Sequence, residues 1–227
     1  MKALSQAFCA LLLLAAPALA APPLPSDPRA ARAVQDYLRA MQAETARDRD
    51  QRVADRMDAL ASHPASPVLG NPRGDVAIIV FSDYACPYCK LAEPRLMALV
   101  AADKGVKIVM KEFPILTRAS MIASRMALAA HKQGKYRPFH LALMRREGAL
   151  DEAGILETAR AAGLDVARAR RDMLAADVSD EIIANFNLAR GIRAFQTPTY
   201  IVGGRILNSD SANINFAREV AQARRRR

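Results

Sequence analysis

The sequence predicts an α/β fold in which a βαβ half and a ββα half are separated by inserted helices. Two apolar runs, at 76–81 and 106–113, flank a helix-like run, and a crossover of this kind joins parallel strands. Near the C-terminus, a strand at 199–202 turns through two glycines into another at 205–207. The stretch between the halves, about 117–190, has the alanine-rich and charged composition of helices.

The first residues predict a cleaved secretory signal. Lys2 precedes an apolar run from Ala7 to Ala16, and Ala18-Leu19-Ala20 supplies the small residues of a cleavage site. The run is too short to span a bilayer. We therefore expect residues 1–20 to be removed and the mature chain to be a soluble periplasmic protein. Cys9 would leave with the signal, so the mature chain would keep only two cysteines.

An N-terminal helical segment, residues 21–63, should precede the main domain at 64–227. The helix itself should run from Arg29 to Ala61, with Asp27 as its cap and Pro28 in its first turn. Its apolar stripe is too thin to fold alone, so it needs either its own domain or a second copy of the chain. Both arrangements, including a homo-oligomer through this segment, remain open. The stripe consists of Val34, Tyr37, Leu38, Met41, Val53, Met57 and Leu60.

The elements of the main domain follow in order. A turn at Gly70–Gly74 should lead into the first strand, and the helix after that strand contains Pro94, which should kink it. A last helix should run from about Ser211 to Ala223. The inserted stretch should hold five helices, at 120–132, 137–146, 151–163, from Asp165, and at 179–189 before Gly191.

The charge of the chain is strongly basic. Lys and Arg number 33 against 23 Asp and Glu, which gives a formal net charge of +10, and part of this excess lies in the tail Arg224–Arg227. Such a tail could indicate a nucleic-acid partner. Aromatic residues make up only 5% and Trp is absent, so platforms for base stacking are not evident. We expect no nucleic-acid partner and interpret the tail as a solvated terminus.

The sequence Cys86-Pro87-Tyr88-Cys89 carries the chemistry. It comes directly after the first predicted strand and opens the next helix, whose N-terminus supplies partial positive charge. That charge favours the thiolate of Cys86, and a thiolate is the nucleophile of disulfide exchange. Pro87 and Tyr88 should tune the redox potential by fixing the helix start and the field at the Cys86 sulfur. The sequence therefore predicts a redox-active disulfide that needs no other cofactor.

Other interpretations of the two cysteines are weaker. A zinc site needs further ligands, and His63, His131 and His140 do not have ligand spacing, so we expect no metal. A structural disulfide across two residues would remove little chain entropy. From a different functional class, the dithiol could serve a binding protein as a soft Cu(I) site, although no further thiolate or thioether ligand is evident.

Several motifs together resemble the DsbA family of bacterial disulfide oxidoreductases. They are the stretch from Phe81 to Lys90, Lys111 to Leu116, Gly134-Lys135-Tyr136 with Phe139-His140, and Thr197 to Tyr200. Within the family the chain is most similar to the ScsC-like branch, because Ser66–Leu69 followed by Gly70-Asn71-Pro72 matches the junction after its N-terminal helical segment. The resemblance implies a thioredoxin-like fold with an inserted helical subdomain.

The resemblance also implies roles for individual residues. Cys86 would be the exposed attacking cysteine, and Cys89 the buried resolving one. Thr197 and Pro198 would form a cis-proline loop that faces the active site, where the Thr197 backbone can pair with an extended substrate peptide.

One position departs from the family pattern. Many relatives have a glutamate six residues before the first cysteine, thought to help move a proton for the buried thiol, and this chain has Val80 there. Lys111 and Glu112 are the remaining candidates for a proton relay, by family position alone. Because a strand alternates its faces, at most one of them should point inward. The alternative for either is an ordinary exposed charge.

The expected function is that of a periplasmic thiol–disulfide oxidoreductase acting on cysteine-containing exported proteins. Its direction is open. The helical segment 21–63 and Thr197 before Pro198 slightly favour an isomerase or reductase, which would self-associate and be kept reduced. The alternative is a monomeric dithiol oxidase that a membrane redox partner recharges.

Overall fold

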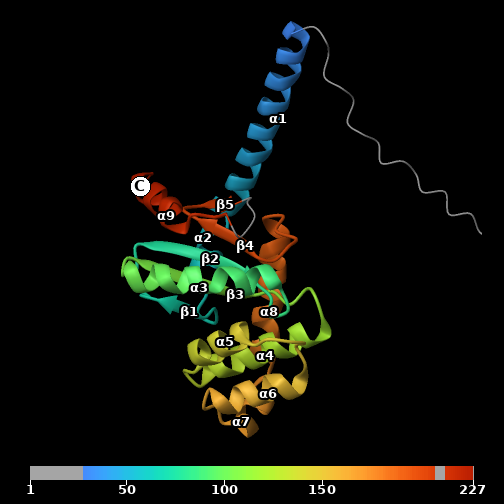
Figure 1. Ribbon diagram of the computed structural model, residues 1–227, viewed down its shortest axis with the longest axis vertical. Coiled ribbons are helices and arrows are strands. Elements are labelled where there is room, and N and C mark those ends of the chain that lie inside the picture. The colour runs from blue at the N-terminus through green and yellow to red at the C-terminus, as the bar shows by residue number, and fades with distance from the viewer. Residues whose placement is uncertain (1–27, 208–212, 227) are drawn as a thin grey trace, which may run out of the picture. The chain divides into compact units, whose positions relative to one another are not determined.

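The computed structural model describes residues 28–207 and 213–226 (Figure 1). The chain divides into two compact units, Met1–Ala43 and Glu44–Arg227, and the site discussed below belongs to the second. The predicted signal peptide at 1–20 lies outside the described residues. Among the residues described, no helix is both long enough and apolar enough to cross a membrane.

A five-stranded sheet forms the centre of the second unit, in the order β1-β3-β2-β4-β5. β2 and β3 are parallel, and the other pairs are antiparallel. This confirms the predicted α/β fold with a βαβ half and a ββα half. β1 was not predicted, because its three residues are too short to show a strand periodicity. The strands are β1 (Val68–Gly70), β2 (Val76–Ser82), β3 (Val106–Glu112), β4 (Thr199–Val202) and β5 (Arg205–Leu207).

The helices of the described chain follow the predicted order, with shifts at their ends. The last helix begins at Phe216, later than predicted, and the segment 208–212 before it lies outside the described residues. The helices are α1 (Pro28–Ala54), α2 (Met57–Ala61), α3 (Pro87–Ala102), α4 (Arg118–Lys132), α5 (Tyr136–Arg145), α6 (Glu152–Ala161), α7 (Val166–Asp172), α8 (Ala176–Gly191) and α9 (Phe216–Arg225).

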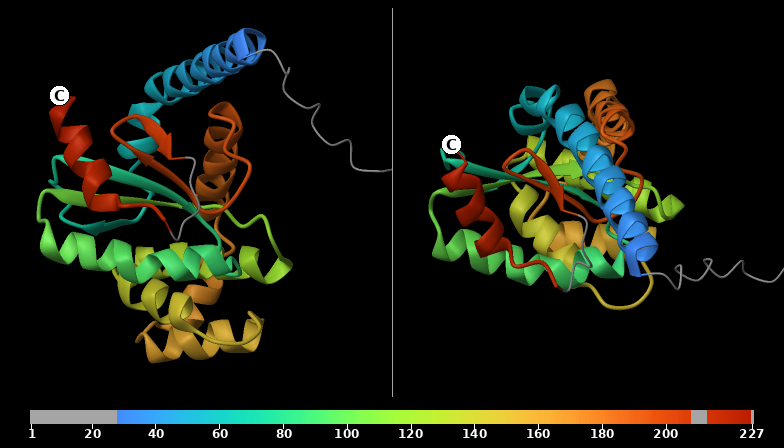
Figure 2. Two further views of the ribbon diagram at one scale, coloured as in Figure 1. Left: turned by 45° about the horizontal axis from the view of Figure 1, so that its top comes forward. Right: turned by 90° about the horizontal axis from the view of Figure 1, so that it is seen from above.

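Helices cover both faces of the sheet, as the left view of Figure 2 shows for α3 and α8. On one face, Ile78 and Ile108 belong to a core with residues of α3, α5 and α9. On the other face, Ile79 belongs to a second core with residues of α2, α8 and the end of α1. Most side chains of the central strands therefore point into a protein interior, and only Ala77 and Lys107 in β2 and β3 are half-buried.

The predicted N-terminal helix is interrupted, and its second part belongs to the main domain. α1 ends at Ala54 and α2 begins at Met57. Val53 and Leu60 are completely buried in the core on the α8 side of the sheet, which explains why the compact unit begins at Glu44 and not at the predicted residue 64. The side chains of four other stripe residues lie outside what the structure describes, so the predicted packing of this part of the stripe is not tested. These residues are Val34, Tyr37, Leu38 and Met41.

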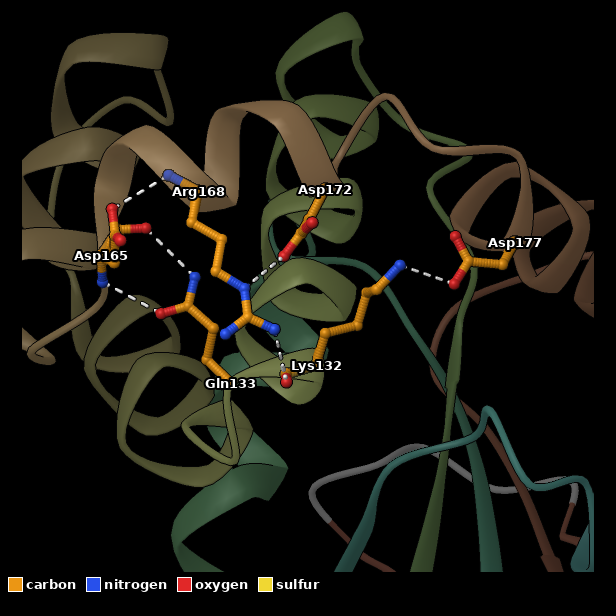
Figure 3. Close-up of polar contacts among 6 residues, drawn as sticks. All are labelled: Lys132, Gln133, Asp165, Arg168, Asp172 and Asp177. Atoms are coloured by element: carbon orange, nitrogen blue, oxygen red, sulfur yellow. Dashed lines mark hydrogen bonds and ion pairs between the residues drawn. The ribbon is translucent and has the colours of Figure 1, made fainter.

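The inserted helices α4, α5, α6 and α7 gather together (Figure 1), and polar contacts around the end of α4 join them to α8 (Figure 3). Lys132 Nζ lies 2.6 Å from Asp177 of α8. The Gln133 side chain accepts from the Asp165 backbone N–H at 3.0 Å and donates to its carbonyl at 3.1 Å. Arg168 donates to the Lys132 carbonyl at 3.4 Å. These surface contacts are weak singly, but together they connect α4 to α7 and α8.

The turn after α8 is made by an arginine. α8 ends at Gly191, as predicted, and two residues later Arg193 has a left-handed backbone, at φ 57°. A residue with a side chain pays about 1 kcal/mol for this conformation, which is why glycine is usual there. Gly191 instead leaves room for Arg56, since a Cβ at position 191 would lie 2.6 Å from the Arg56 Nε atom.

Candidate active site

Cys86 is the N-cap of α3, directly before its first helical residue, where the chain passes from strand to helix. Its backbone is extended, at φ −78° and ψ 116°, and its sulfur accepts a hydrogen bond from the Cys89 backbone N–H at 3.4 Å. Pro87 fills the first helical turn, where its missing N–H is not needed. Both cysteines are free thiols in this structure. The first turn of α3 therefore surrounds the Cys86 sulfur with groups that stabilise negative charge.

The two thiols differ in acidity. A hydrogen bond from the Cys89 side chain, helped by the backbone N–H groups of Cys89 and Tyr88, lowers the pKa of Cys86 to about 6. Burial raises the pKa of Cys89 far above its usual value. Near neutral pH, the reduced site therefore holds one thiolate and one thiol. Tyr88 is 57% exposed beside this pair.

The resemblance implied an exposed Cys86, and the structure corrects this. Cys86 is 2% exposed and Cys89 is 4% exposed, so the two side chains have nearly the same small exposed area. Cys86 is covered because the loop before β4 lies against it. The two thiols differ in pKa because hydrogen bonds at the helix N-terminus lower the pKa of Cys86, whereas burial raises that of Cys89.

The loop of Thr197 and Pro198 faces the site, as predicted. The Thr197–Pro198 peptide bond is cis, and the Thr197 carbonyl accepts a hydrogen bond from the Cys86 thiol at 3.3 Å. Thr199 Oγ1 donates to the Gln196 carbonyl at 2.8 Å and so fixes the loop where β4 begins. The structure thus brings together Cys86, Cys89 and the segment 197–198 from distant parts of the sequence.

Lys111 and Glu112 are both buried, so the expectation that at most one points inward is wrong. Lys111 is 0% exposed and Glu112 is 2% exposed. The faces of β3 do alternate, but helices cover both faces. The two side chains therefore enter different cores, and neither is an ordinary exposed charge.

Lys111 points to the face of the sheet covered by α2 and α8. Its Nζ atom donates to Ser66 Oγ at 2.7 Å and to the Ala59 carbonyl at 3.2 Å. Ser66 in turn donates to Glu181 at 2.7 Å. Burial lowers the pKa of Lys111 to about 8. These contacts connect β3 with α2 and α8, so the structure does not bring Lys111 to the cysteines.

Glu112 points to the face covered by α3 and α5, where it joins a buried polar cluster. Tyr84 and Tyr136 donate to the same Glu112 oxygen, at 3.1 and 2.7 Å. Tyr84 also lies 2.9 Å from His140 Nδ1, and His140 Nε2 lies 3.4 Å from Glu93 Oε2. Burial raises the pKa of Glu112. We call Tyr84, Glu93, Glu112, Tyr136 and His140 the acid cluster.

Sequence reasoning did not find most of this cluster. Glu93 comes four residues after Cys89, so the two side chains share one face of α3, and both are buried. That spacing is the signal that could have identified Glu93. Val80, at the position where relatives have glutamate, is buried beneath the helix as part of the apolar core. Acidic groups under α3 therefore come from α3 and β3, and not from β2.

The fold and the site define a class. A parallel β2–α3–β3 unit with Cys-x-x-Cys at the start of its helix, faced by a cis-proline loop, is the arrangement of thioredoxin-like thiol–disulfide oxidoreductases. Consistent with this, the chain belongs to the family of DSBA-like thioredoxin domains, whose match covers residues 77–220.

Solved structures agree with that membership. A thioredoxin-like oxidoreductase from Silicibacter pomeroyi DSS-3 is 40% identical, with a TM-score of 0.70 over 74% of this chain and 97% of that one. The catalytic domain of ScsC from Proteus mirabilis is 25% identical, with a TM-score of 0.68 over 77% of this chain and 97% of that one. The second likeness supports the ScsC-like branch that the sequence motifs indicated.

A curated relative is a much longer protein. The Na(+)/H(+) antiporter NhaA 3 of Salinispora tropica is 28% identical over 140 residues, which cover 61% of this chain and 22% of the antiporter. The chain thus spans about a fifth of the length of the curated relatives it matches.

Proposed function

We propose that this protein exchanges disulfides with cysteine-containing exported proteins through Cys86 and Cys89. The observation that carries the proposal is the contrast between the two thiols, with the pKa of Cys86 lowered to about 6 and that of Cys89 raised. A thiol that ionises below neutral pH is a good nucleophile and a good leaving group. Cys89, whose pKa is raised, stays protonated in the reduced site.

The exchange balances as two sulfur displacements. In the oxidising direction, a substrate thiolate attacks Cys86 of the Cys86–Cys89 disulfide, and Cys89 leaves and takes up a proton. A second substrate thiolate then attacks the substrate sulfur of the mixed disulfide and releases Cys86 as a thiolate. The substrate loses two electrons and the site gains them. In the reducing direction the same steps run backwards, and isomerisation returns the site unchanged.

Surrounding residues support these steps. The N–H groups of the first turn of α3 stabilise the Cys86 thiolate when it leaves. Thr197 lies against the sulfur and offers its backbone to an extended substrate. Pro87 and Tyr88 fix the start of the helix and shape the field at Cys86.

The acid cluster is the proposed proton source for Cys89, with Glu112 as its member on β3. Burial raises the pKa of Glu112, so this carboxyl keeps its proton to higher pH than an exposed one and can give it to the departing thiolate. Glu93, one turn after Cys89 on α3, is the member nearest to it along the helix. Lys111 lies on the other face of the sheet, so we assign it no part in this relay.

Export and direction also belong to the proposal. We place the mature chain in the periplasm on the strength of the signal sequence at 1–20, which N-terminal sequencing of the exported protein tests. Isomerase or reductase use remains our preference, and oxidation with recharging by a membrane partner is the alternative. Because Val53 and Leu60 are buried in the chain's own core, self-association through 21–63 would depend on the stripe residues before Glu44.

The experiment is a redox titration of the mature protein in glutathione buffers, with the Cys86–Cys89 state read by alkylation and mass. A single two-electron transition with a measurable potential supports the proposal, and its value separates oxidase from reductase. A pair that stays oxidised at every accessible potential would be a structural disulfide and would contradict it.

A further inference from the structure

A cavity of about 270 Å³ lies beside the loop that contacts Cys86. Its lining includes Arg193, Phe195, Gln196 and Thr199, which flank Thr197 and Pro198, together with Arg49 and Leu207. No assigned role uses this cavity. We call it the Arg193 pocket. Several of its lining residues belong to the loop of Thr197 and Pro198, on which a substrate would lie.

Arg193 has a backbone conformation that residues with a side chain rarely adopt. It adopts the left-handed conformation at φ 57° in the turn after α8, where glycine would be more stable. Strain of this kind, when it is observed, points to a function for the side chain. Arg193 is exposed, and its charge lies at the wall of the pocket.

The carboxylates near the pocket already have arginine partners. Asp48 of α1 is bonded to Arg52 at 2.9 Å, and Arg193 acts on it only as a more distant charge. Asp50 lies 3.5 Å from Arg205. The pocket thus presents positive charge from Arg193, and no carboxylate is among its lining residues.

An apolar surface adjoins this charge. Phe195 is 69% exposed in the same loop, and Tyr88 and Leu91 are 57% and 54% exposed at the start of α3. Large exposed apolar side chains around a reactive sulfur are typical of a surface that binds a polypeptide. A substrate joined to Cys86 would therefore meet apolar groups on α3 and positive charge beyond the loop.

We propose that the Arg193 pocket binds an acidic side chain of the substrate, two or three residues from its reactive cysteine. An extended peptide covers about 7 to 10 Å over that distance, and most of the pocket's lining residues lie close in sequence to Thr197. The proposal rests on the proposed function and specifies its substrate class as unfolded segments with aspartate or glutamate near a cysteine. Arg193 would thus set specificity without taking part in the sulfur chemistry.

The test uses the full mature chain and three peptides of equal length. Each peptide carries one cysteine as a mixed disulfide with thionitrobenzoate, and Asp, Asn or Lys two residues away. Attack of the Cys86 thiolate on the peptide sulfur forms the enzyme–peptide disulfide and releases coloured thionitrobenzoate. We expect the Asp peptide to react about five- to tenfold faster than the Asn peptide, the size of one partly buried charge-assisted contact, and the Lys peptide to react most slowly.

The variants separate specificity from folding. Arg193→Gly should melt at the same or a higher temperature than the natural protein, because glycine relieves the left-handed strain, yet it should lose the preference for Asp. Arg193→Lys should keep part of the preference. Arg170→Gln, which removes the same charge from exposed α7, should keep all of it.

The outcomes test the role of the Arg193 pocket separately from the proposed disulfide exchange. Equal rates for the three peptides, or an unchanged Asp preference in Arg193→Gly, would overturn the role of the pocket and leave the disulfide exchange standing. No reaction with any peptide would overturn the proposed function itself.

Discussion

Cys86 and Cys89 are three residues apart on one helix, but their surroundings are opposite. Cys86 lies at the N-terminus of α3, where hydrogen bonds lower its pKa to about 6. Cys89 lies one turn further in, where burial raises its pKa. Both side chains have almost no exposed surface. The comparison shows that solvent-exposed area alone does not decide which thiol reacts, because hydrogen bonds at the helix N-terminus lower the pKa of Cys86 whereas burial raises that of Cys89.

The largest expected effect comes from removing either sulfur. Cys86→Ser should lower the rate of disulfide exchange by about a hundredfold or more, because no low-pKa nucleophile remains. Cys89→Ser should still attack substrates but should accumulate mixed disulfides, since nothing resolves them from within. Exchange rates and the mass of trapped adducts measure both effects. The reverse pattern, with adducts in Cys86→Ser, would exchange the two roles.

A second change sharpens the electrostatic side of the comparison. The hydrogen bond from Cys89 is the largest cause of the low pKa of Cys86, so Cys89→Ala should raise that pKa. Cys89→Ser is the matched control, because its hydroxyl can still donate, and it should raise the pKa less. The pH profile of alkylation by iodoacetamide in each variant gives the values. Equal shifts in both variants would assign the low pKa to the helix backbone alone.

A third change concerns the proton that Cys89 must take up. Glu112→Gln and Glu93→Gln should each slow the step that releases Cys89 by roughly tenfold near neutral pH, as expected for loss of a positioned proton donor. Lys111→Met, on the other face of the sheet, is the control and should leave this rate unchanged. Stopped-flow reduction of the disulfide measures the step. A slow Lys111→Met with normal Glu variants would move the relay to the other face.

The smallest expected effect is on stability. The folded pKa of Lys111, about 8, lies below its usual 10.5, so the unfolded chain binds more protons between these values. Relative to Lys111→Met, the natural protein should therefore become more stable as pH rises from 8 towards 10.5. At neutral pH the variant should be less stable, by about 1 to 3 kcal/mol, because the Ala59 carbonyl and Ser66 Oγ lose their buried donor. Urea unfolding at several pH values checks this, and a flat difference would contradict it.

The sequence was sufficient for the parts of the fold that depend on local pattern. The strand before Cys86 and the helix after it follow from apolar runs and the cysteine spacing, and that junction alone predicts an activated thiol. The motif at 197–200 located the loop opposite the site through resemblance. These features are decided by residues close in sequence or by motifs shared across a family.

Features that depend on packing could not be predicted in this way. Lys111 and Glu112 do point to opposite faces of β3, as the alternation of side chains along a strand predicts. The sequence did not show that helices cover both of these faces. His140 of α5 reaches Tyr84, which donates to Glu112, only because α5 packs beside α3. The left-handed turn at position 193 could not be predicted, because the residue there is arginine and not the glycine that usually marks such a turn. In each case, the missing information was which elements pack together.

The most direct test of the central claim is alkylation of the reduced mature protein across pH, with each adduct mapped by mass. We predict that Cys86 is modified first, at a rate that rises through about pH 6 and levels off by neutral pH, while Cys89 is modified only after unfolding. Modification of Cys89 first, or a Cys86 rate that rises only near its ordinary pKa of 9.0, would contradict the account.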